Sequence, residues 1–286
     1  MVYVGVDIGG TNINSGLVKK GRIIKESTRK TNVKRGKEAV IQNILKCIKE
    51  VLSSDTKAIG IGCPGPIDLE RGIIKNTPNL PLNNVNLRSI INKKFGIPVF
   101  LDNDANCFTL GEAVHGVAKN SNIVLGITLG TGVGGGIVIN KKIFHGKGNA
   151  GELGHITINF NGPKSKCGNN GCLESYISAR AIMKRTIGLN VKNPREIYEL
   201  AEQKNKKALK ILEETGFYLG VGLANLINAF HPEIIVIGGN ISNSWKFFKK
   251  KLKETIKKRA LFNDVKIIKS RLNGSTILGA ASLCLG

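Results

Sequence analysis

Short apolar runs alternate with amphipathic stretches through the first part of the chain. Residues 2–8 and 58–64 are apolar and rich in β-branched side chains, which predicts buried strands, and a further strand is expected at residues 98–104. Residues 37–54 carry apolar side chains at helical spacing, and residues 86–96 predict a helix that ends at a glycine. Strands that alternate with helices in this way indicate an α/β fold built on a sheet.

The hydrophobic pattern of residues 4–24 returns at residues 125–144. When the two segments are aligned, Gly5 meets Gly126 and Gly9 meets Gly130. Each segment predicts a strand, a Gly/Thr turn, a second strand, a basic turn and a third strand. Self-similarity on this scale predicts a chain made of two related halves.

Helical patterns dominate the second half, at residues 173–186, 193–203 and about 206–229. A buried strand is expected at residues 233–240. We expect an N-terminal α/β lobe at residues 1–118 and a C-terminal α/β lobe at residues 119–274. The C-terminal helix, residues 275–286, is expected to pack back on the first lobe.

The chain is strongly basic, with 43 Lys and Arg against 20 Asp and Glu and a formal charge of +23. This charge fits either a lysine-rich solvated surface or a nucleic-acid-binding protein. The lysines are spread along the sequence and aromatic residues are few, which favours the first interpretation and predicts no specific nucleic-acid partner. In either case the positive field attracts anionic substrates such as nucleotides. No apolar run of membrane length and no signal-peptide pattern is present, so we expect a cytoplasmic protein without a membrane partner.

Two glycine-rich turns follow predicted strands, DIGGT at residues 7–11 and TLGTGVGGG at 128–136. Glycine permits backbone N–H groups to approach phosphate oxygens closely. One such turn alone is as well explained by a tight hairpin. Two turns at equivalent positions of a repeat favour a site for the phosphates of a nucleotide.

Polar residues in two other segments are typical of a site for a polyol. Asp104 lies where a predicted strand meets a helix, a position that points into the ligand site of α/β sheets. It could act as a general base, or the DND sequence could simply cap the helix. Glu152 and His155 lie three residues apart, and Glu174 follows two cysteines. These groups can donate to and accept from several hydroxyls.

The combination of these motifs resembles the ROK family of sugar kinases, epimerase-kinases and sugar-responsive repressors. The motifs are DIGGTN, GCPGPID, LDNDAN, ITLGTGVGGGI, GNAGELGH, CGNNGCLE and IIVIGGN, and they extend over nearly the whole chain. The resemblance implies the actin-like, ribonuclease-H-like duplicated α/β fold, in which two lobes flank a central cleft. That expectation agrees with the internal repeat.

The resemblance also implies roles for individual residues. Asp104 would be the catalytic base, and Asp7 would help to position Mg²⁺ through the phosphates of ATP. The residues implied to bind the sugar are Gly65, Asn79, Asn103, Asp104, Glu152, His155 and Glu174. Those implied to bind ATP are Gly9, Gly10, Thr11, Asn12, Thr131, Gly132, Gly238 and Gly239.

A structural zinc site in the family uses one histidine and three cysteines, and this chain matches three of the four ligands. His155, Cys167 and Cys172 occupy ligand positions, whereas Ser165 stands at the position of the first cysteine. A neutral serine hydroxyl is a poor fourth ligand for zinc. Either zinc is bound with reduced affinity, or the loop folds without metal and its cysteines are small apolar residues.

The function implied is ATP-dependent phosphorylation of a hexose hydroxyl, with glucose as the first candidate. N-acetylmannosamine, N-acetylglucosamine, fructose and allose are alternatives, and polyphosphate could replace ATP. A sugar-responsive repressor is a second hypothesis, disfavoured because DIGGT begins at residue 7 and leaves no room for a preceding helix-turn-helix. A homodimer or higher homo-oligomer is expected from the resemblance.

Overall fold

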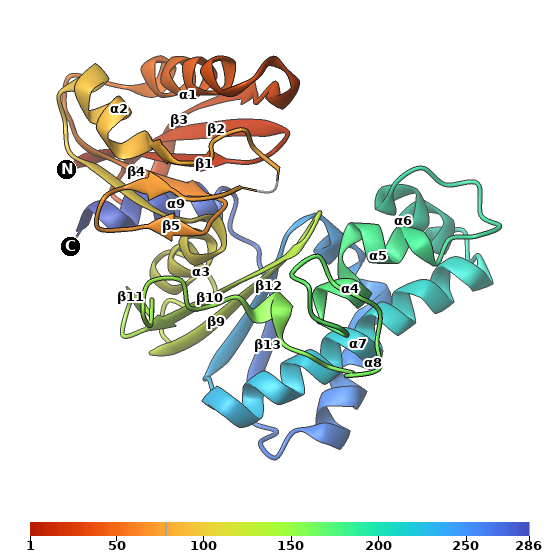
Figure 1. The fold of residues 1–286 in the computed structure, drawn as a ribbon. Coiled ribbons are helices and arrows are strands. Elements are labelled where there is room, and N and C mark those ends of the chain that lie inside the picture. Colours follow the sequence, from red (N-terminus) through yellow and green to blue (C-terminus); the bar gives the residue numbers. More distant parts are fainter. Residues whose placement is uncertain (78, 286) are drawn as a thin grey trace. The chain divides into compact units, whose positions relative to one another are not determined.

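The computed structural model describes residues 1–77 and 79–285 of the chain. Strands and helices alternate through its first half as the hydrophobic pattern predicts (Figure 1). The strands are β1 (Val2–Ile8), β2 (Asn12–Lys19), β3 (Arg22–Lys30), β4 (Thr56–Cys63), β5 (Ile67–Asp68), β6 (Ile73–Ile74), β7 (Val85–Asn86), β8 (Val99–Asn103), β9 (Ile123–Leu129), β10 (Val133–Ile139), β11 (Lys142–Ile143), β12 (Ile234–Gly238) and β13 (Lys266–Lys269). The helices are α1 (Lys37–Val51), α2 (Leu87–Phe95), α3 (Asp104–Val114), α4 (Glu174–Ile177), α5 (Ala179–Lys184), α6 (Pro194–Glu202), α7 (Lys206–Phe230), α8 (Trp245–Arg259) and α9 (Ser275–Ser282).

Two five-stranded sheets share one plan. Their strand orders are β3-β2-β1-β4-β8 and β11-β10-β9-β12-β13. In the first sheet β2 pairs antiparallel with both β1 and β3, whereas β4 lies parallel to β1 and β8. In the second, β10 and β11 are antiparallel and β12 and β13 are parallel. This correspondence agrees with the duplication predicted from the repeated hydrophobic pattern.

The chain divides into two compact units, each built from several segments. Unit 1 comprises residues 1–126, 136–151 and 270–286, and unit 2 comprises residues 127–135 and 152–269. The sequence analysis expects the boundary between two lobes at residue 118, and this boundary stays a prediction. Among the described residues, no helix combines the length and apolar character needed to cross a bilayer.

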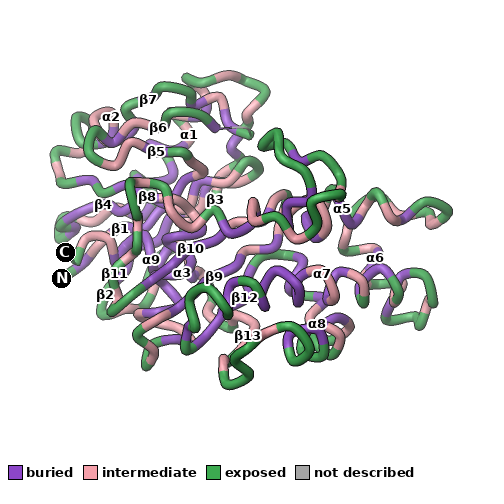
Figure 2. Tube along the Cα trace, turned by 60° about the horizontal axis from the view of Figure 1, so that its bottom comes forward, coloured by how far each residue is buried: buried purple, intermediate pink, exposed green. Residues whose placement is uncertain are grey.

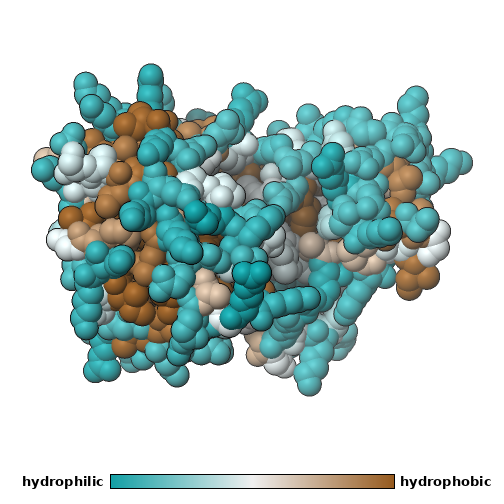
Figure 3. All heavy atoms as spheres, turned by 90° about the horizontal axis from the view of Figure 1, so that it is seen from above, coloured by the Kyte–Doolittle hydropathy of each residue, from teal (hydrophilic) through white to brown (hydrophobic). Residues whose placement is uncertain are grey.

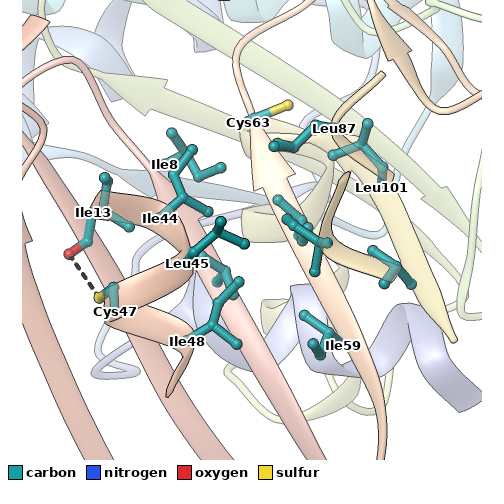
Figure 4. Close-up of a cluster of buried hydrophobic side chains, with 14 of the residues drawn as sticks. Ile8, Ile13, Ile44, Leu45, Cys47, Ile48, Ile59, Cys63, Leu87 and Leu101 are labelled. Atoms are coloured by element: carbon teal, nitrogen blue, oxygen red, sulfur yellow. Dashed lines mark hydrogen bonds between the residues drawn. The ribbon is translucent and has the colours of Figure 1, made fainter. Parts of the chain in front are cut away.

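One face of the first sheet is covered by α1, whose apolar side chains recur at helical spacing. Val40, Ile44 and Ile48 are fully buried and belong to the same hydrophobic core as Ile8 and Ile59 (Figure 4). Burial of such side chains contributes about 1.5–3 kcal/mol each. The apolar residues whose helical spacing predicted a helix at residues 37–54 are therefore the ones with which α1 packs against the sheet.

On the other side, α9 packs against β1, β4 and α3 at backbone distance. A Cβ atom on Gly60 would lie 1.7 Å from the carbonyl oxygen of Ala280. A Cβ atom on Gly279 would lie 1.7 Å from the carbonyl oxygen of Cys107. Only glycine permits these approaches, and they hold α3 in place, the helix that begins at Asp104.

Unit 2 is dominated by the long helix α7 and its partner α8, which pack along each other (Figures 1 and 2). A Cβ atom on Gly216 would lie 2.4 Å from the carbonyl oxygen of Phe248, and one on Gly220 would meet Thr255. These two glycines therefore serve close helix packing.

Two features differ from the sequence prediction. The helix expected at residues 173–186 is two helices, α4 and α5, because Ser178 has an extended backbone and its side chain accepts the N–H of Ala181. Strands β5, β6 and β7 form a three-stranded sheet that was not predicted. Each of these strands has two residues, too few for an alternating pattern to be recognised.

Lysines dominate the exposed surface, and hydrophilic side chains cover most of the face drawn in Figure 3. Lys141 differs from the other lysines in its role. Its ammonium group donates to the carbonyl oxygens of Ala113, Lys119 and Ser121 at 2.8, 2.6 and 2.9 Å. A cation here stabilises the C-terminal end of α3 and the turn that follows.

Replacing Lys141 by methionine is expected to lower the free energy of unfolding by about 2 kcal/mol, because three carbonyls lose a charged donor. The matched control is Lys142→Met, one residue further along, where the side chain is exposed. Urea denaturation of both variants measures the difference. Equal stability of the two variants would contradict a structural role for Lys141.

Candidate active site

The junction of β8 and α3 places Asp104 at the first position of a helix. The preceding residue, Asn103, is the N-cap, and its side-chain oxygen accepts the N–H groups of Ala105 and Asn106 at 2.8 and 3.3 Å. Asp104 is half-buried, and its Oδ1 accepts the Ala105 N–H at 2.9 Å. The capping role that the sequence allowed for Asp104 is therefore filled by Asn103.

A second carboxylate lies close enough to interact electrostatically with Asp104. Burial and, next, the negative charge of Asp104 raise the pKa of Asp7 to about 6, while a hydrogen bond from Asn14 opposes the shift. Two carboxylates that repel each other are the kind of donor set that a hard cation such as Mg²⁺ stabilises. The buried Asp7 carboxylate therefore has the chemistry to help position the magnesium ion implied for the site.

Each glycine-rich turn is closed by one backbone hydrogen bond. Gly9 N–H donates to the Asn12 carbonyl at 2.9 Å, and Gly130 N–H donates to the Gly132 carbonyl at 2.9 Å. Gly10 is exposed and lies against Asn79, to which a Cβ atom on Gly10 would come within 3.6 Å. The buried side-chain oxygen of Asn12 has no hydrogen-bond partner among the described residues. An unsatisfied buried acceptor beside an exposed turn indicates a ligand or water at this position.

In unit 2, Glu152 and His155 flank a single 3₁₀ turn, Leu153–His155. The Glu152 carboxylate and His155 Nε2 are 3.9 Å apart. Gly154 lies within this turn against the backbone of Val133, where a Cβ atom would come within 2.1 Å of the carbonyl oxygen. The GELGH sequence thus brings its acid and its histidine close together.

Glu174 is held at the second glycine-rich turn. Its Oε2 accepts the N–H of Val133 at 2.8 Å, and a Cβ atom on Gly132 would lie 2.5 Å from the same oxygen. The sequence assigned Glu174 to the sugar and Gly132 to a phosphate, and the structure makes them neighbours. Gly239 has φ +81° and lies against the backbone of Leu129, so packing alone requires glycine there.

The predicted sugar residues are distributed over both units. Within unit 1, Gly65 lies beside Asn103, and Asp104 is the residue that follows Asn103 in the sequence. Unit 2 contains Glu152, His155 and Glu174. The ATP residues are divided as well, with Gly9, Gly10, Thr11 and Asn12 in unit 1 and Thr131, Gly132, Gly238 and Gly239 in unit 2.

The predicted zinc ligands lie together in unit 2. The ligand atoms of His155, Cys167 and Cys172 lie within 4.8 Å of one another, and the two sulfur atoms are 3.5 Å apart. His155 Nδ1 and Ser165 Oγ are buried, and neither has a hydrogen-bond partner among the described residues. The nearby Ser165 hydroxyl and next the Asn169 N–H lower the pKa of Cys167 to about 7. Three residues fit a metal, and the fourth position holds a hydroxyl.

Sequence reasoning missed Asp102 and His145, which are both in unit 1. His145 Nε2 lies 2.7 Å from the Asp102 carboxylate, and this hydrogen bond raises the pKa of His145. The two residues are 43 positions apart, so no local pattern connects them. A weak signal was available, because Asp102 directly precedes Asn103 and Asp104.

The chain matches the model of the ROK family over residues 3–286. It is 37% identical to a glucokinase from Thermotoga maritima, covering 98% of this chain and 96% of that one. It is 34% identical to a xylose repressor from Bacillus subtilis, covering 99% of this chain and 76% of the repressor. Among solved structures, it resembles a ROK family glucokinase from Streptomyces griseus in complex with glucose and AMPPNP, with a TM-score of 0.89, 29% identity and full coverage of both chains.

The duplicated α/β fold and these matches define the molecule as an ATP-dependent sugar kinase. The chain belongs to the ROK family. The fold and the enzyme class predicted from the sequence motifs are thereby confirmed.

Proposed function

We propose that this kinase phosphorylates glucose, transferring the γ-phosphoryl group of ATP to the 6-hydroxyl to give glucose 6-phosphate and ADP. The main support for the proposed reaction is the position of Asp104, a carboxylate in the first turn of α3. The N-cap of this helix is Asn103 and not Asp104. The choice of sugar is supported by the glucokinases from Thermotoga maritima and Halalkalibacterium halodurans, each 37% identical to the chain. The glucose in the Streptomyces griseus complex supports the same choice.

In this mechanism Asp104 accepts the proton of the sugar hydroxyl, and the hydroxyl oxygen attacks the γ-phosphorus in line with the departing ADP oxygen. Asn103, Glu152, His155 and Glu174 hydrogen-bond the other hydroxyls, with Gly65 and Asn79 nearby. Asp7 would help to position Mg²⁺ through the phosphates, and the bound ion would supply positive charge toward the phosphoryl oxygens.

The nucleotide is bound chiefly through backbone groups. The two glycine-rich turns hold the phosphates, and the end of β12 approaches the adenosine. The Asn12 side-chain oxygen, buried and without a partner among the described residues, accepts a hydrogen bond once ligand or ordered water is present. ATP as the donor also fits the basic character of the chain and a cytoplasmic location, and we propose a homo-oligomer as the functional form.

A coupled assay with ATP and Mg²⁺ over a panel of sugars tests the substrate. The panel contains glucose, N-acetylmannosamine, N-acetylglucosamine, fructose and allose, and a parallel series replaces ATP by polyphosphate. We expect the highest kcat/KM for glucose with ATP. A higher value for any other sugar, or for polyphosphate, would replace glucose or ATP in the proposal without changing the enzyme class.

Zinc in unit 2 would have a geometric role. With His155 Nδ1 directed to the metal, the ring would be fixed and Nε2 would remain for the sugar. Cys167 and Cys172 would supply the thiolates, and Ser165 or a water would complete the coordination. We therefore propose a weak site that holds one zinc per chain or less.

Ser165→Cys is expected to raise zinc affinity by roughly tenfold or more, because a thiolate replaces a neutral hydroxyl at the fourth position. Metal content after dialysis against a graded series of chelator measures the change. Ser53→Cys, which adds a thiol in unit 1, is the matched control. Full chelator-resistant zinc in the unmodified protein, or no gain in the Ser165 variant, would contradict this geometry.

A further inference from the structure

Asp102 is a buried carboxylate whose hydrogen bonds connect the end of β8 to the first turn of α3. The residue is 4% exposed. Its Oδ1 accepts the backbone N–H of Asn103 at 2.7 Å and the side-chain amide of Asn106 at 2.9 Å. Its Oδ2 is bound by His145 Nε2 at 2.7 Å. A buried carboxylate needs such partners, because leaving one oxygen unsatisfied costs the desolvation of that oxygen.

His145 belongs to a short loop that is closed on itself and anchored at a second point. The N–H groups of Gly148 and Ala150 both donate to the His145 carbonyl, at 2.8 and 3.0 Å. The side-chain oxygen of Asn149 accepts the backbone N–H of Ile67 at 3.0 Å. The loop therefore binds two segments of unit 1, the one that carries Asp104 and the one that follows Gly65.

We propose that loop 145–149 is a positioning element for the acceptor sugar, in which His145 holds Asp102 and, through it, the backbone that carries Asn103 and Asp104. The proposal rests on the role of Asp104 as the catalytic base. His145 and Asp102 are positioning residues here, because neither is argued to contact the substrate. The motif GNAGELGH then supplies more than Glu152 and His155. Its Asn149 also anchors the loop, because the Asn149 side chain accepts the backbone N–H of Ile67 at the start of β5.

The physical argument concerns the freedom of the Asp102 carboxylate. With His145 in place, both carboxylate oxygens have partners, and these partners come from two segments of chain, the β8–α3 junction and loop 145–149. Without His145, we expect the Asp102 side chain to rotate so that Oδ2 reaches other donors or water. The backbone N–H of Asn103, which is bonded to Oδ1, would then shift as well. A shift on the order of 1 Å at a general base costs about 10²-fold in rate, whereas the fold loses only one hydrogen bond.

The test is a kinetic comparison of five variants on the sugar that the panel selects. His145→Leu removes the donor to Asp102 and is expected to lower kcat roughly 10- to 100-fold, with KM for ATP within about threefold of wild type. His145→Gln retains an N–H donor at similar reach and is expected to recover most of that loss. The control is His231→Leu, because His231 also binds an aspartate, Asp264 at 3.2 Å, but in unit 2, and its kcat is expected to equal that of wild type.

The double variant Asp104→Asn/His145→Leu separates positioning from general damage. If His145 acts chiefly through Asp104, the second substitution is expected to cause a much smaller loss once the base is gone, with only the contribution through Asn103 remaining. An additive loss, a wild-type kcat in folded His145→Leu, or an equal loss in His231→Leu would overturn the proposal. Full activity of Asp104→Asn alone would instead refute the base on which the proposal rests.

Discussion

Asp104→Asn is expected to lower kcat by roughly 10²–10⁴-fold, because asparagine cannot accept the proton of the sugar hydroxyl. The substitution preserves shape, and the asparagine oxygen can still accept the Ala105 N–H that Asp104 Oδ1 binds at 2.9 Å. The N-cap of α3 is Asn103, so the helix start is retained. KM for ATP should therefore change little.

The measurement is steady-state kinetics at saturating sugar and Mg²⁺-ATP, with product detected as ADP and as sugar phosphate. Asp55→Asn, an exposed aspartate after α1, is the matched control and should be fully active. An Asp104 variant that retained activity within about tenfold of wild type would contradict general-base catalysis by this residue.

Asp7→Asn is expected to have opposite effects on stability and activity. The pKa of Asp7 is raised from 3.8 to about 6 by burial and by Asp104. Between these pH values the folded protein binds a proton that the unfolded chain has released, so stability falls as pH rises through that window. Above pH 6 the ionised carboxylate costs about 2–3 kcal/mol, and asparagine removes that cost.

Unfolding by urea at pH 7.5 should thus show the Asp7 variant to be more stable than wild type in the absence of ligand. Well below pH 3.8 the difference should vanish, since the wild-type carboxyl is then protonated in both states. At the same time kcat with Mg²⁺-ATP should fall by roughly 10²-fold or more, because the anion that positions the metal is lost. A variant that is active, or no more stable at pH 7.5, would contradict this assignment.

Much of the fold could be predicted from the sequence because its signals are local. β-branched runs predicted β1 and β4, and apolar residues at helical spacing predicted α1 and α7. The repeated Gly/Thr turn predicted the duplication before any strand order was known. The break at Ser178 could not be foreseen, because the surrounding sequence contains neither glycine nor proline.

In the candidate site, too, features with a local sequence signal could be predicted and contacts between distant segments could not. Asp104 could be predicted from its place between a strand and a helix, and GELGH from its spacing. The bond from His145 to Asp102 and the carbonyls around Lys141 could not, since both depend on segments that meet only in the folded chain. The sequence predicts that Ser165 is a poor fourth ligand for zinc. In the structure its hydroxyl oxygen is buried and has no hydrogen-bond partner among the described residues.

The most direct measurement is a crystal structure of the wild-type protein grown with glucose and AMPPNP. The proposed mechanism predicts that the 6-hydroxyl oxygen lies about 2.6–3.2 Å from a carboxylate oxygen of Asp104 and faces the terminal phosphate. A complex with both ligands bound, in which no sugar hydroxyl comes within hydrogen-bond reach of Asp104, would contradict it.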